Sequence, residues 1–221
     1  LMRSQLATLK NPEMILRIAR EENKLEDVER ICIFKSTETF DQLRKNKLVK
    51  EDALLFINSI ASVSLNDEDR ERFHRYFSHI QSQIVVEVTE EENMSEEALI
   101  RKRETKGFSG MFALDDYGSG YNTEINLLNL SPKYIKIDLT IVRNIDKDFD
   151  KQQLVSNIVE YAHQREGYII AEGIETKEEL LKVLELGVDY LQGYYLSYPQ
   201  LNPQEVSNES IKTIENYWKK R

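Results

Sequence analysis

The stretch MFALDDYGSGY at residues 111–121 decides the architecture of this chain. An apolar run of strand length, residues 111–114, ends on the adjacent aspartates Asp115 and Asp116, and glycines follow directly. A short run that is apolar on both faces is typical of a strand in a parallel sheet. Glycines behind it allow a tight turn and a movable loop. The stretch therefore predicts a strand whose acidic end opens into a loop.

Runs of the same length and character recur on both sides of this stretch. They alternate with longer, charge-rich segments of helical period, which is the pattern of repeated βα units and implies a parallel sheet. The other candidate strands are Ala53 to Ile57, Ile84 to Val86, Tyr134 to Ile137, Tyr168 to Ala171 and a short one at Tyr190-Leu191.

Helix starts between these strands carry side chains that cap backbone N–H groups. A second helical stretch near the amino terminus passes through Val28, Ile31 and Phe34. The predicted starts are Asn11-Pro12, Asn66, Ser95, Thr176 with Glu179 as a capping box, and Asn202-Pro203 with Glu205.

The bulk composition fits one α/β domain over residues 1–221, because this length buries a full core without a second domain. Hydrophobic residues make up 40% and charged residues 31%, and no apolar stretch approaches the roughly 20 residues that span a bilayer. We therefore expect no membrane insertion by this segment. The net charge of −9 argues against binding a nucleic acid polymer.

The chain opens Leu1-Met2-Arg3-Ser4, without the cationic leader and apolar stretch of a secretory signal. Its single cysteine, Cys32, excludes an internal disulfide and a cysteine-based metal site, and fits a reducing compartment. We expect a cytoplasmic location, which is compatible with a parent protein tethered to a membrane. A start at leucine suggests a fragment whose upstream residues are missing.

Polar side chains stand at or just after the carboxyl end of each predicted strand. In a (β/α)8 barrel these ends share one face, where the chemistry is found, so we expect the side chains to converge. They are Asn58, Glu87, Asp115, Asp116, Asp138, Glu172 and Gln192.

Five carboxylates in one pocket force some of them to bind protons or cations. Oxygen donors without thiolate or histidine favour hard ions, Mg²⁺ or Mn²⁺, with Ca²⁺ as a competitor. Adjacent Asp115 and Asp116 allow one carboxylate to bridge two ions, and two ions suit in-line attack on a phosphodiester.

Lys136 lies two residues before Asp138 on the same predicted strand, so both side chains point to the same side. Its ammonium fits an electrostatic role, holding the attacking hydroxide or steadying charge on the phosphoryl group, better than a Schiff base.

Alternatives remain for each residue taken singly. Acidic residues after strands also cap the next helix, and Asp-Gly sequences also form plain turns. Lys136 also fits an edge-strand charge, and Gln192 also fits a backbone hydrogen-bond partner. Taken together, the set favours one shared site.

Five ordered motifs resemble those of the EAL family of cyclic di-GMP phosphodiesterases, from the amino terminus to about Pro199. The motifs are EVTE at residues 87–90, DDYGSGY at 115–121, YIKID at 134–138, AEGIET at 171–176 and QGY at 192–194. The resemblance implies a TIM-type α/β barrel with one antiparallel strand and a linear product, pGpG.

The same resemblance implies a role for each matching residue. Asn58 and Glu87 would bind the first metal ion, Asp115 would be shared, and Asp116 and Glu172 would bind the second. Lys136 would hold the nucleophilic water, and Asp138 and Gln192 would support that water and the metal shell. Glu90 and Glu175 would anchor the glycine-containing loop. Leu1 and Arg3 would contact the substrate, with Arg3 reaching a phosphate.

The chain departs from the family pattern at its signature. The one Glu-Ala-Leu triplet, residues 97–99, falls in a predicted helix, whereas Leu1-Met2-Arg3 resembles the end of the true signature. We therefore expect a truncated first strand, with the signature glutamate, a first-metal ligand, upstream of Leu1 and the fragment inactive without it. Tyr117 stands for the usual phenylalanine, and Tyr198 stands where a basic residue often precedes Pro199.

The expected function is metal-dependent hydrolysis of cyclic di-GMP in bacterial second-messenger signalling. The alternative is a catalytically inactive cyclic di-GMP receptor that signals through partners. A third possibility is hydrolysis of another dinucleotide, because a fold does not fix a substrate. The family resemblance also leads us to expect a homodimer and an upstream sensory or GGDEF cyclase domain in the parent chain.

Overall fold

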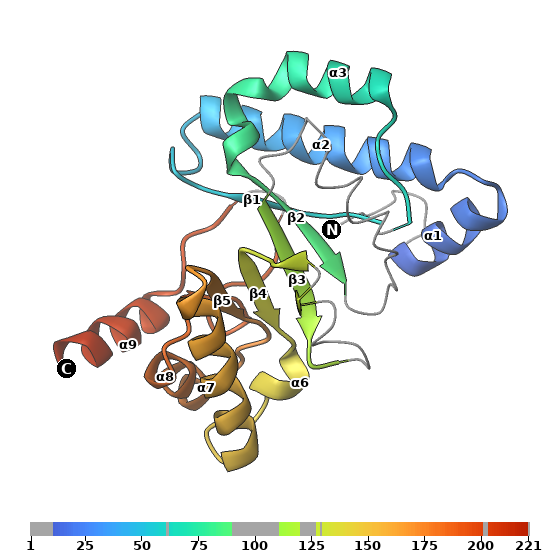
Figure 1. The fold of residues 1–221 in the computed structure, drawn as a ribbon. Helices are drawn as coiled ribbons and strands as arrows, with labels where there is room; N and C mark the ends of the chain where they lie inside the picture. The colour runs from blue at the N-terminus through green and yellow to red at the C-terminus, as the bar shows by residue number, and fades with distance from the viewer. Residues whose placement is uncertain are drawn as a thin grey trace. The chain divides into compact units, whose positions relative to one another are not determined.

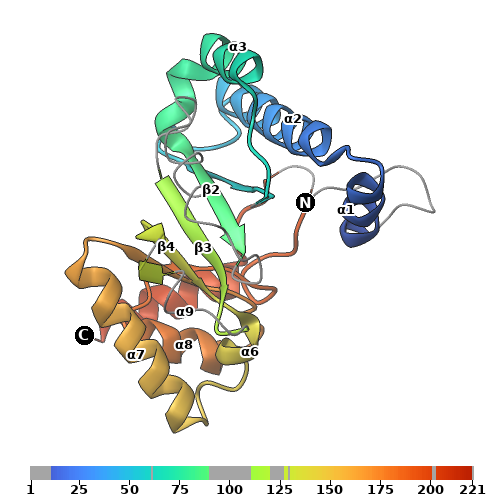
Figure 2. The ribbon, with the colours of Figure 1, turned by 45° about the vertical axis from the view of Figure 1, so that its right-hand side comes forward.

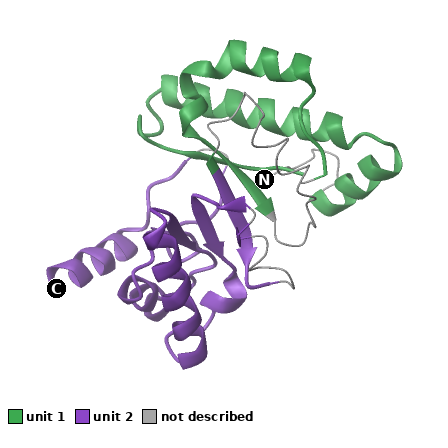
Figure 3. Cartoon of the chain, viewed as in Figure 1, with its two compact units in different colours: residues 1–88, 92–111 green, residues 89–91, 112–221 purple. Residues whose placement is uncertain are grey.

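The computed structural model of the chain describes residues 11–60, 62–89, 111–119, 127–128, 130–200 and 203–220. The chain divides into two compact units, drawn in different colours in Figure 3. Unit 1 comprises residues 1–88 and 92–111, and unit 2 comprises residues 89–91 and 112–221. Two compact units can belong to one domain, so the single domain over residues 1–221 stays a prediction.

Unit 1 is built from helices and one parallel strand pair. Its elements are α1 (Pro12–Glu21), α2 (Leu25–Lys45), β1 (Leu55–Asn58), α3 (Asp67–Phe77), the 3-10 helix η2 (Ser78–Gln83) and β2 (Ile84–Thr89). In Figure 1, α2 runs alongside α3, and α2 also packs against β1. β1 pairs with β2 in parallel, with Leu55 opposite Ile84 and Asn58 opposite Glu87.

Two helices of unit 1, α1 and α3, begin where the capping residues predict. Asn11 accepts a hydrogen bond from the Glu13 N–H at 3.0 Å, with Pro12 at the first helical position. Asn66 accepts one from the Asp69 N–H at 2.8 Å. Each cap satisfies a backbone donor that the helix itself leaves without a partner.

The core of unit 1 joins α2 and α3 to both strands. Phe34 meets the Phe73 ring edge-on, with ring centroids 5.4 Å apart. The buried cluster consists of Ile33, Ile57, Leu65, Phe73 and Ile84, against which Phe34, Leu55 and Phe77 pack. This apolar contact fixes the strand pair that carries Asn58 and Glu87.

Unit 2 contains the regular βα repeat. Its elements are β3 (Met111–Tyr117), β4 (Tyr134–Ile137), α6 (Leu139–Val142), α7 (Phe149–Gln164), β5 (Tyr168–Ala171), α8 (Lys177–Glu185), β6 (Tyr190–Leu191) and α9 (Asn208–Lys219). β4 pairs in parallel with β3 and β5, and β5 with β6, as the alternating pattern predicts. Figure 2 shows α7 beside β4, and α7 also packs on β5.

Burial on both faces explains why β3, β4 and most of β5 are apolar runs. All four residues of β4 are buried, including Lys136. Thr176 and Glu179 form the predicted capping box at the start of α8, with the Glu179 N–H donating to Thr176 Oγ1 at 3.2 Å.

Several boundaries differ from the expectations. β1 begins at Leu55 and not at Ala53, and β2 and β3 continue through Thr89 and Tyr117. The helix expected from Asn202-Pro203 is wrong in its start, because α9 begins at Asn208 with Ser207 as its cap. Ser207 satisfies the Ser210 N–H at 3.1 Å, a better local cap than the proline position offers.

Other expectations fall on residues outside the described ranges. The helix start at Ser95 and the truncated first strand at residues 1–4 are among them. The strand pairs given above are parallel, so the antiparallel strand stays a prediction. Within the described ranges, no helix combines the length and apolar character needed to cross a bilayer.

Candidate metal and phosphodiester site

Three carboxylates of unit 2 gather at the carboxyl ends of two strands. Asp115 and Asp116 lie near the end of β3, and Glu172 directly follows β5. One carboxylate oxygen from each lies within 4.8 Å of the others. The ends of parallel strands meet at one edge of a sheet, which is why residues 56 positions apart in the chain come together here.

Lys136 of β4 bridges this cluster. Its Nζ lies 2.7 Å from Asp115 Oδ1 and 2.7 Å from Glu172 Oε1, and its side chain is only 8% exposed. A buried ammonium is stable only where carboxylates compensate its lost hydration. β4 lies between β3 and β5, so Lys136 is placed between the two acidic strand ends.

Asp116 shows that one lysine does not neutralise the cluster. Burial first, and then repulsion from Asp115, Glu172 and Asp138, raise the pKa of Asp116 from 3.8 to about 6, although Lys136 opposes the shift. Like charges at close range favour the neutral acid. The same excess of negative charge favours a divalent cation bound by oxygen.

The backbone turns sharply near the carboxyl end of β3, at Asp116 within the strand and at Gly118 just after it. Asp116 has a φ of 56°, in the left-handed region that Asp tolerates better than most residues. Ser119 N–H and Oγ–H both donate to Asp116 O, at 3.1 and 2.9 Å. Gly118 has a φ of 99°, and a Cβ there would lie 2.1 Å from Ile141 Cδ1. The turn therefore requires glycine and fixes Asp116.

Asp138 follows β4 and is buried, but one of its oxygens caps a helix. Oδ1 accepts hydrogen bonds from the Thr140 N–H at 2.8 Å and from Thr140 Oγ1 at 2.5 Å, at the start of α6. The Asp138 N–H donates to Tyr117 O at 3.2 Å, which ties the end of β4 to the end of β3. The capping alternative thus holds for Oδ1, and support of a metal shell by Asp138 stays a prediction.

The segment after Glu172 is held by Glu179, whose wider contacts the sequence did not reveal. The buried Glu179 carboxylate accepts from the Asn144, Glu175 and Thr176 N–H groups, at 2.9, 3.0 and 3.0 Å. Burial by itself raises the pKa of Glu179, but these three bonds outweigh it and hold the pKa below its ordinary value. The capping box predicted the Thr176 bond, whereas the bond from Asn144 spans 35 positions and has no local signal in the sequence.

Glu175 and Gln192 are more exposed than the central carboxylates. Glu175 Oε1 lies 2.6 Å from Arg143 Nη2, in an ion pair at the surface. Gln192 is exposed at the end of β6, where its N–H donates to Ala171 O at 2.8 Å and its carbonyl accepts from Ile174 N–H at 3.1 Å. Their roles as loop anchor and support of the water remain predictions.

In unit 1, Asn58 at the end of β1 lies opposite Glu87, which is two residues before the end of β2. Glu87 is buried and Asn58 exposed. Glu29 of α2 binds the two residues that follow Asn58, a contact across about 30 positions that no local motif signals. The other predicted site residues, Leu1, Arg3 and Glu90, lie outside the described residues.

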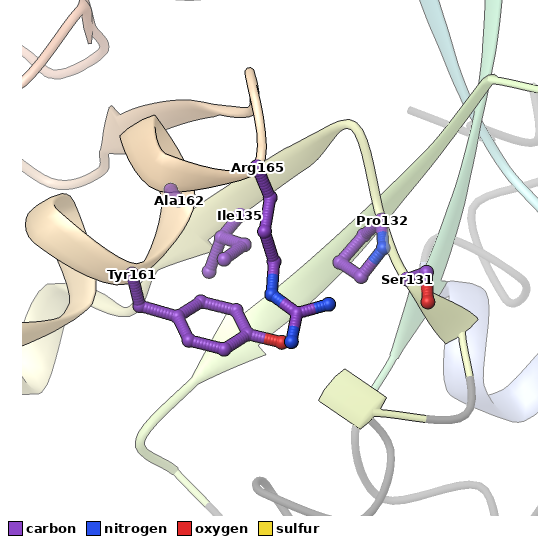
Figure 4. A pocket seen from close by; sticks show the side chains of 6 residues that line it. All are labelled: Ser131, Pro132, Ile135, Tyr161, Ala162 and Arg165. Carbon is purple, nitrogen blue, oxygen red and sulfur yellow. The ribbon is translucent and has the colours of Figure 1, made fainter.

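A cavity of about 230 Å³ in unit 2 is separate from the carboxylate cluster. Ile135 lines it, and adjacent strand residues point to opposite faces, so Lys136 faces the other way. The cavity contains a guanidinium and a phenol but no carboxylate; Figure 4 shows its lining residues, Ser131, Pro132, Ile135, Tyr161, Ala162 and Arg165.

Known proteins resemble this chain in both sequence and fold. Cyclic di-GMP phosphodiesterase PdeF of Escherichia coli (strain K12) is 33% identical over 120 residues, which are 53% of this chain and 16% of PdeF. The chain spans only 16–25% of the length of the first three curated relatives it matches.

Solved structures agree with this likeness. An EAL domain protein from Listeria monocytogenes EGD-e has a TM-score of 0.71 at 22% identity, covering 94% of this chain and 80% of that one. Klebsiella pneumoniae BlrP1, in a calcium and cy-diGMP complex, has a TM-score of 0.73 at 25% identity, covering 93% and 52%. Its manganese complex gives 0.72 at 24% identity, covering 90% and 50%. These likenesses confirm the predicted α/β fold class.

The family assignment rests on the sequence as a whole. The family model described as EAL domain matches residues 1–199, nearly the entire chain, including every motif from residue 87 to residue 194. The chain belongs to the EAL domain family.

Proposed function

We propose that this chain hydrolyses one phosphodiester bond of cyclic di-GMP, giving linear pGpG, with two divalent metal ions. The observation that carries the proposal is Lys136, buried 2.7 Å from both Asp115 and Glu172 within a cluster that also contains Asp116. The relative PdeF is named as a cyclic di-GMP phosphodiesterase, which supports the choice of substrate.

The residues present fit hard divalent ions. Carboxylate oxygens are the donors that Mg²⁺ and Mn²⁺ prefer, and the raised pKa of Asp116 reflects burial first and then neighbouring negative charge, which a cation would neutralise. Ca²⁺ would substitute structurally or inhibit. Bound ions would supply positive charge for the phosphate and lower the pKa of a water molecule.

Each side chain has a part in the proposed reaction. Asp116 and Glu172 would hold one ion and Asn58 and Glu87 the other, and Asp115 would serve both. Lys136 orients the attacking water through its ammonium and stabilises negative charge on the phosphoryl group. Its contacts with Asp115 and Glu172 keep that ammonium fixed, so little reorganisation accompanies the reaction.

The surrounding residues complete the proposed site. Asp138, through Oδ2, and Gln192 support the water, Glu90 and Glu175 anchor the glycine-containing loop, and Leu1 and Arg3 contact the substrate. We further propose a homodimer coupled to the loop at residues 115–120, in the cytoplasm, with an upstream sensory or GGDEF domain. A fully active monomer in light scattering at high concentration would contradict the dimer.

The deciding experiment measures pGpG release from cyclic di-GMP with Mn²⁺ or Mg²⁺, using this chain beside a form extended upstream of Leu1. Turnover in either form supports the phosphodiesterase, and turnover only in the extended form identifies an upstream ligand. Binding of cyclic di-GMP without turnover in both forms supports the receptor instead. Faster hydrolysis of cyclic di-AMP or pGpG would assign another dinucleotide as substrate.

A further inference from the structure

Glu29 is a buried carboxylate in unit 1. It lies on α2 and is only 2% exposed. A buried carboxylate is costly unless hydrogen-bond donors replace its hydration. Glu29 Oε1 accepts from Ser59 Oγ, and Oε2 accepts from the Ile60 N–H at 2.9 Å. Through Glu29, α2 therefore binds the loop that follows β1.

The residues that Glu29 holds come directly after Asn58. The Ser59 N–H donates to Glu87 O at 3.1 Å, while the Ser59 hydroxyl donates to Glu29. Ser59 is thus tied to β2 by its backbone and to α2 by its side chain. Because Asn58 and Glu87 are opposite each other in the strand register, these bonds hold the backbone next to both residues.

We infer that Glu29 is a positioning residue that presents Asn58 and Glu87 to a metal ion without touching the ion. The inference rests on the proposed function, which gives Asn58 and Glu87 the role of metal ligands. Its chemical basis is general: hydrogen bonds around a ligand hold its orientation, and their loss typically weakens metal binding about 10- to 100-fold.

A purely structural role for Glu29 predicts a different behaviour, and α2 itself offers the control. Asp41 is a second buried carboxylate on the same helix, bound to His79 Nε2 at 2.9 Å and to Lys45 Nζ at 2.6 Å. Neither partner belongs to a strand-end loop. Replacing Asp41 therefore perturbs α2 without releasing Asn58.

The experiment compares Glu29→Ala, Glu29→Gln and Asp41→Ala in the extended chain. Direct Mn²⁺ binding is measured by titration calorimetry, stability by thermal unfolding without metal, and mobility by hydrogen exchange at the Ile60 amide. We expect Glu29→Ala to weaken Mn²⁺ binding about tenfold and to speed Ile60 exchange. Glu29→Gln keeps one acceptor oxygen and should recover part of both losses. Asp41→Ala should lower stability but leave Mn²⁺ affinity unchanged.

The outcomes separate this inference from the proposed function. Wild-type Mn²⁺ affinity in Glu29→Ala, or an equal loss in Asp41→Ala, would overturn the positioning role while leaving the phosphodiesterase intact. Absence of Mn²⁺ binding in the wild-type protein would overturn the metal site and the positioning role together. If Glu29→Ala does not fold, the comparison of Glu29→Gln with the wild type decides: unchanged affinity and unchanged exchange at Ile60 contradict the inference.

Discussion

The strand ends of the two units differ in how much charge they concentrate. In unit 2, Asp115 and Glu172 pair with the buried Lys136 beside Asp116, and the pKa of Asp116 rises to about 6. In unit 1, an amide and one carboxylate, Asn58 and Glu87, face each other across a strand pair. The first arrangement carries an unrelieved excess of negative charge, so we expect it to dominate cation binding. The second arrangement contributes less charge, and its main contribution is the placement of the Asn58 and Glu87 side chains.

The loops that follow the strands are nevertheless held in the same way in both units. A buried glutamate from a helix accepts hydrogen bonds from the loop that follows the strand: Glu29 holds Ser59 and Ile60, and Glu179 holds Glu175 and Thr176. The comparison shows that the strands carry the charged side chains, whereas the helices supply the glutamates that hold the loops.

The largest expected effect comes from breaking the charged end. Glu172→Gln removes a negative charge but little volume, so turnover should fall by on the order of a thousandfold while thermal unfolding changes little. The exposed Glu178→Gln, on α8, is the matched control and should retain wild-type turnover. Initial rates of pGpG release measure both. Full activity in Glu172→Gln would remove the metal assignment.

Lys136→Met tests the bridge within that charged end. The methionine keeps an unbranched side chain but removes the ammonium, so turnover should fall about 100- to 1000-fold. Mn²⁺ affinity should be retained or increase, because the carboxylates lose their competing cation. Calorimetry and initial rates on the same preparation separate these effects. A parallel loss of Mn²⁺ binding would show that Lys136 acts mainly in holding the fold of the site.

Asn58→Ala tests the end that carries less charge, and the expected effect is smaller. Losing one neutral ligand should weaken Mn²⁺ binding about tenfold without abolishing it. Titration calorimetry measures the change against Glu172→Gln under the same conditions. An effect of Asn58→Ala equal to or larger than that of Glu172→Gln would reverse the ranking of the two ends.

The smallest effect concerns pH in the metal-free protein. Because the folded state raises the pKa of Asp116, it favours the protonated acid, so this stabilisation is present below about pH 4 and lost as the pH rises through about 6. With allowance for solvent at this half-buried group, the free energy of unfolding should fall by on the order of 1–2 kcal/mol.

Urea unfolding from pH 4 to pH 7 measures this trend, with Asp116→Asn as the control that should flatten it. Mn²⁺ at pH 7 should restore the stability, because the ion binds only the folded state. A wild-type profile as flat as that of Asp116→Asn would contradict an unrelieved excess of charge in unit 2.

The sequence predicted β3, β4 and β5 well because they are largely buried on both faces and read as short apolar runs. It also identified the residues that the structure brings together, Asp115, Asp116, Lys136 and Glu172, since each stands at or near a strand end. It placed the last helix several residues early, because Asn202-Pro203 imitates the start that Ser207 actually provides.

What the sequence did not predict depends on contacts between distant residues. Glu29 resembles any helical glutamate until its partners, Ser59 and Ile60, are known. Likewise, the capping box does not reveal that Glu179 also binds Asn144, 35 positions away. Periodicity and local motifs describe an element and its ends, whereas these bonds join two elements.

The backbone contact at Gly193 has a mechanical consequence. An added Cβ there would lie 2.1 Å from Ile174 O and 2.3 Å from Ile174 N, so the segment after β6 rests directly on the segment after β5. Hydrogen bonds from Ile174 to Gln192 and from Tyr195 to Ile174 lock the two segments together. The two segments can therefore move only together. A displacement of the segment after β6 is transmitted to Glu172, which lies two residues upstream of Ile174.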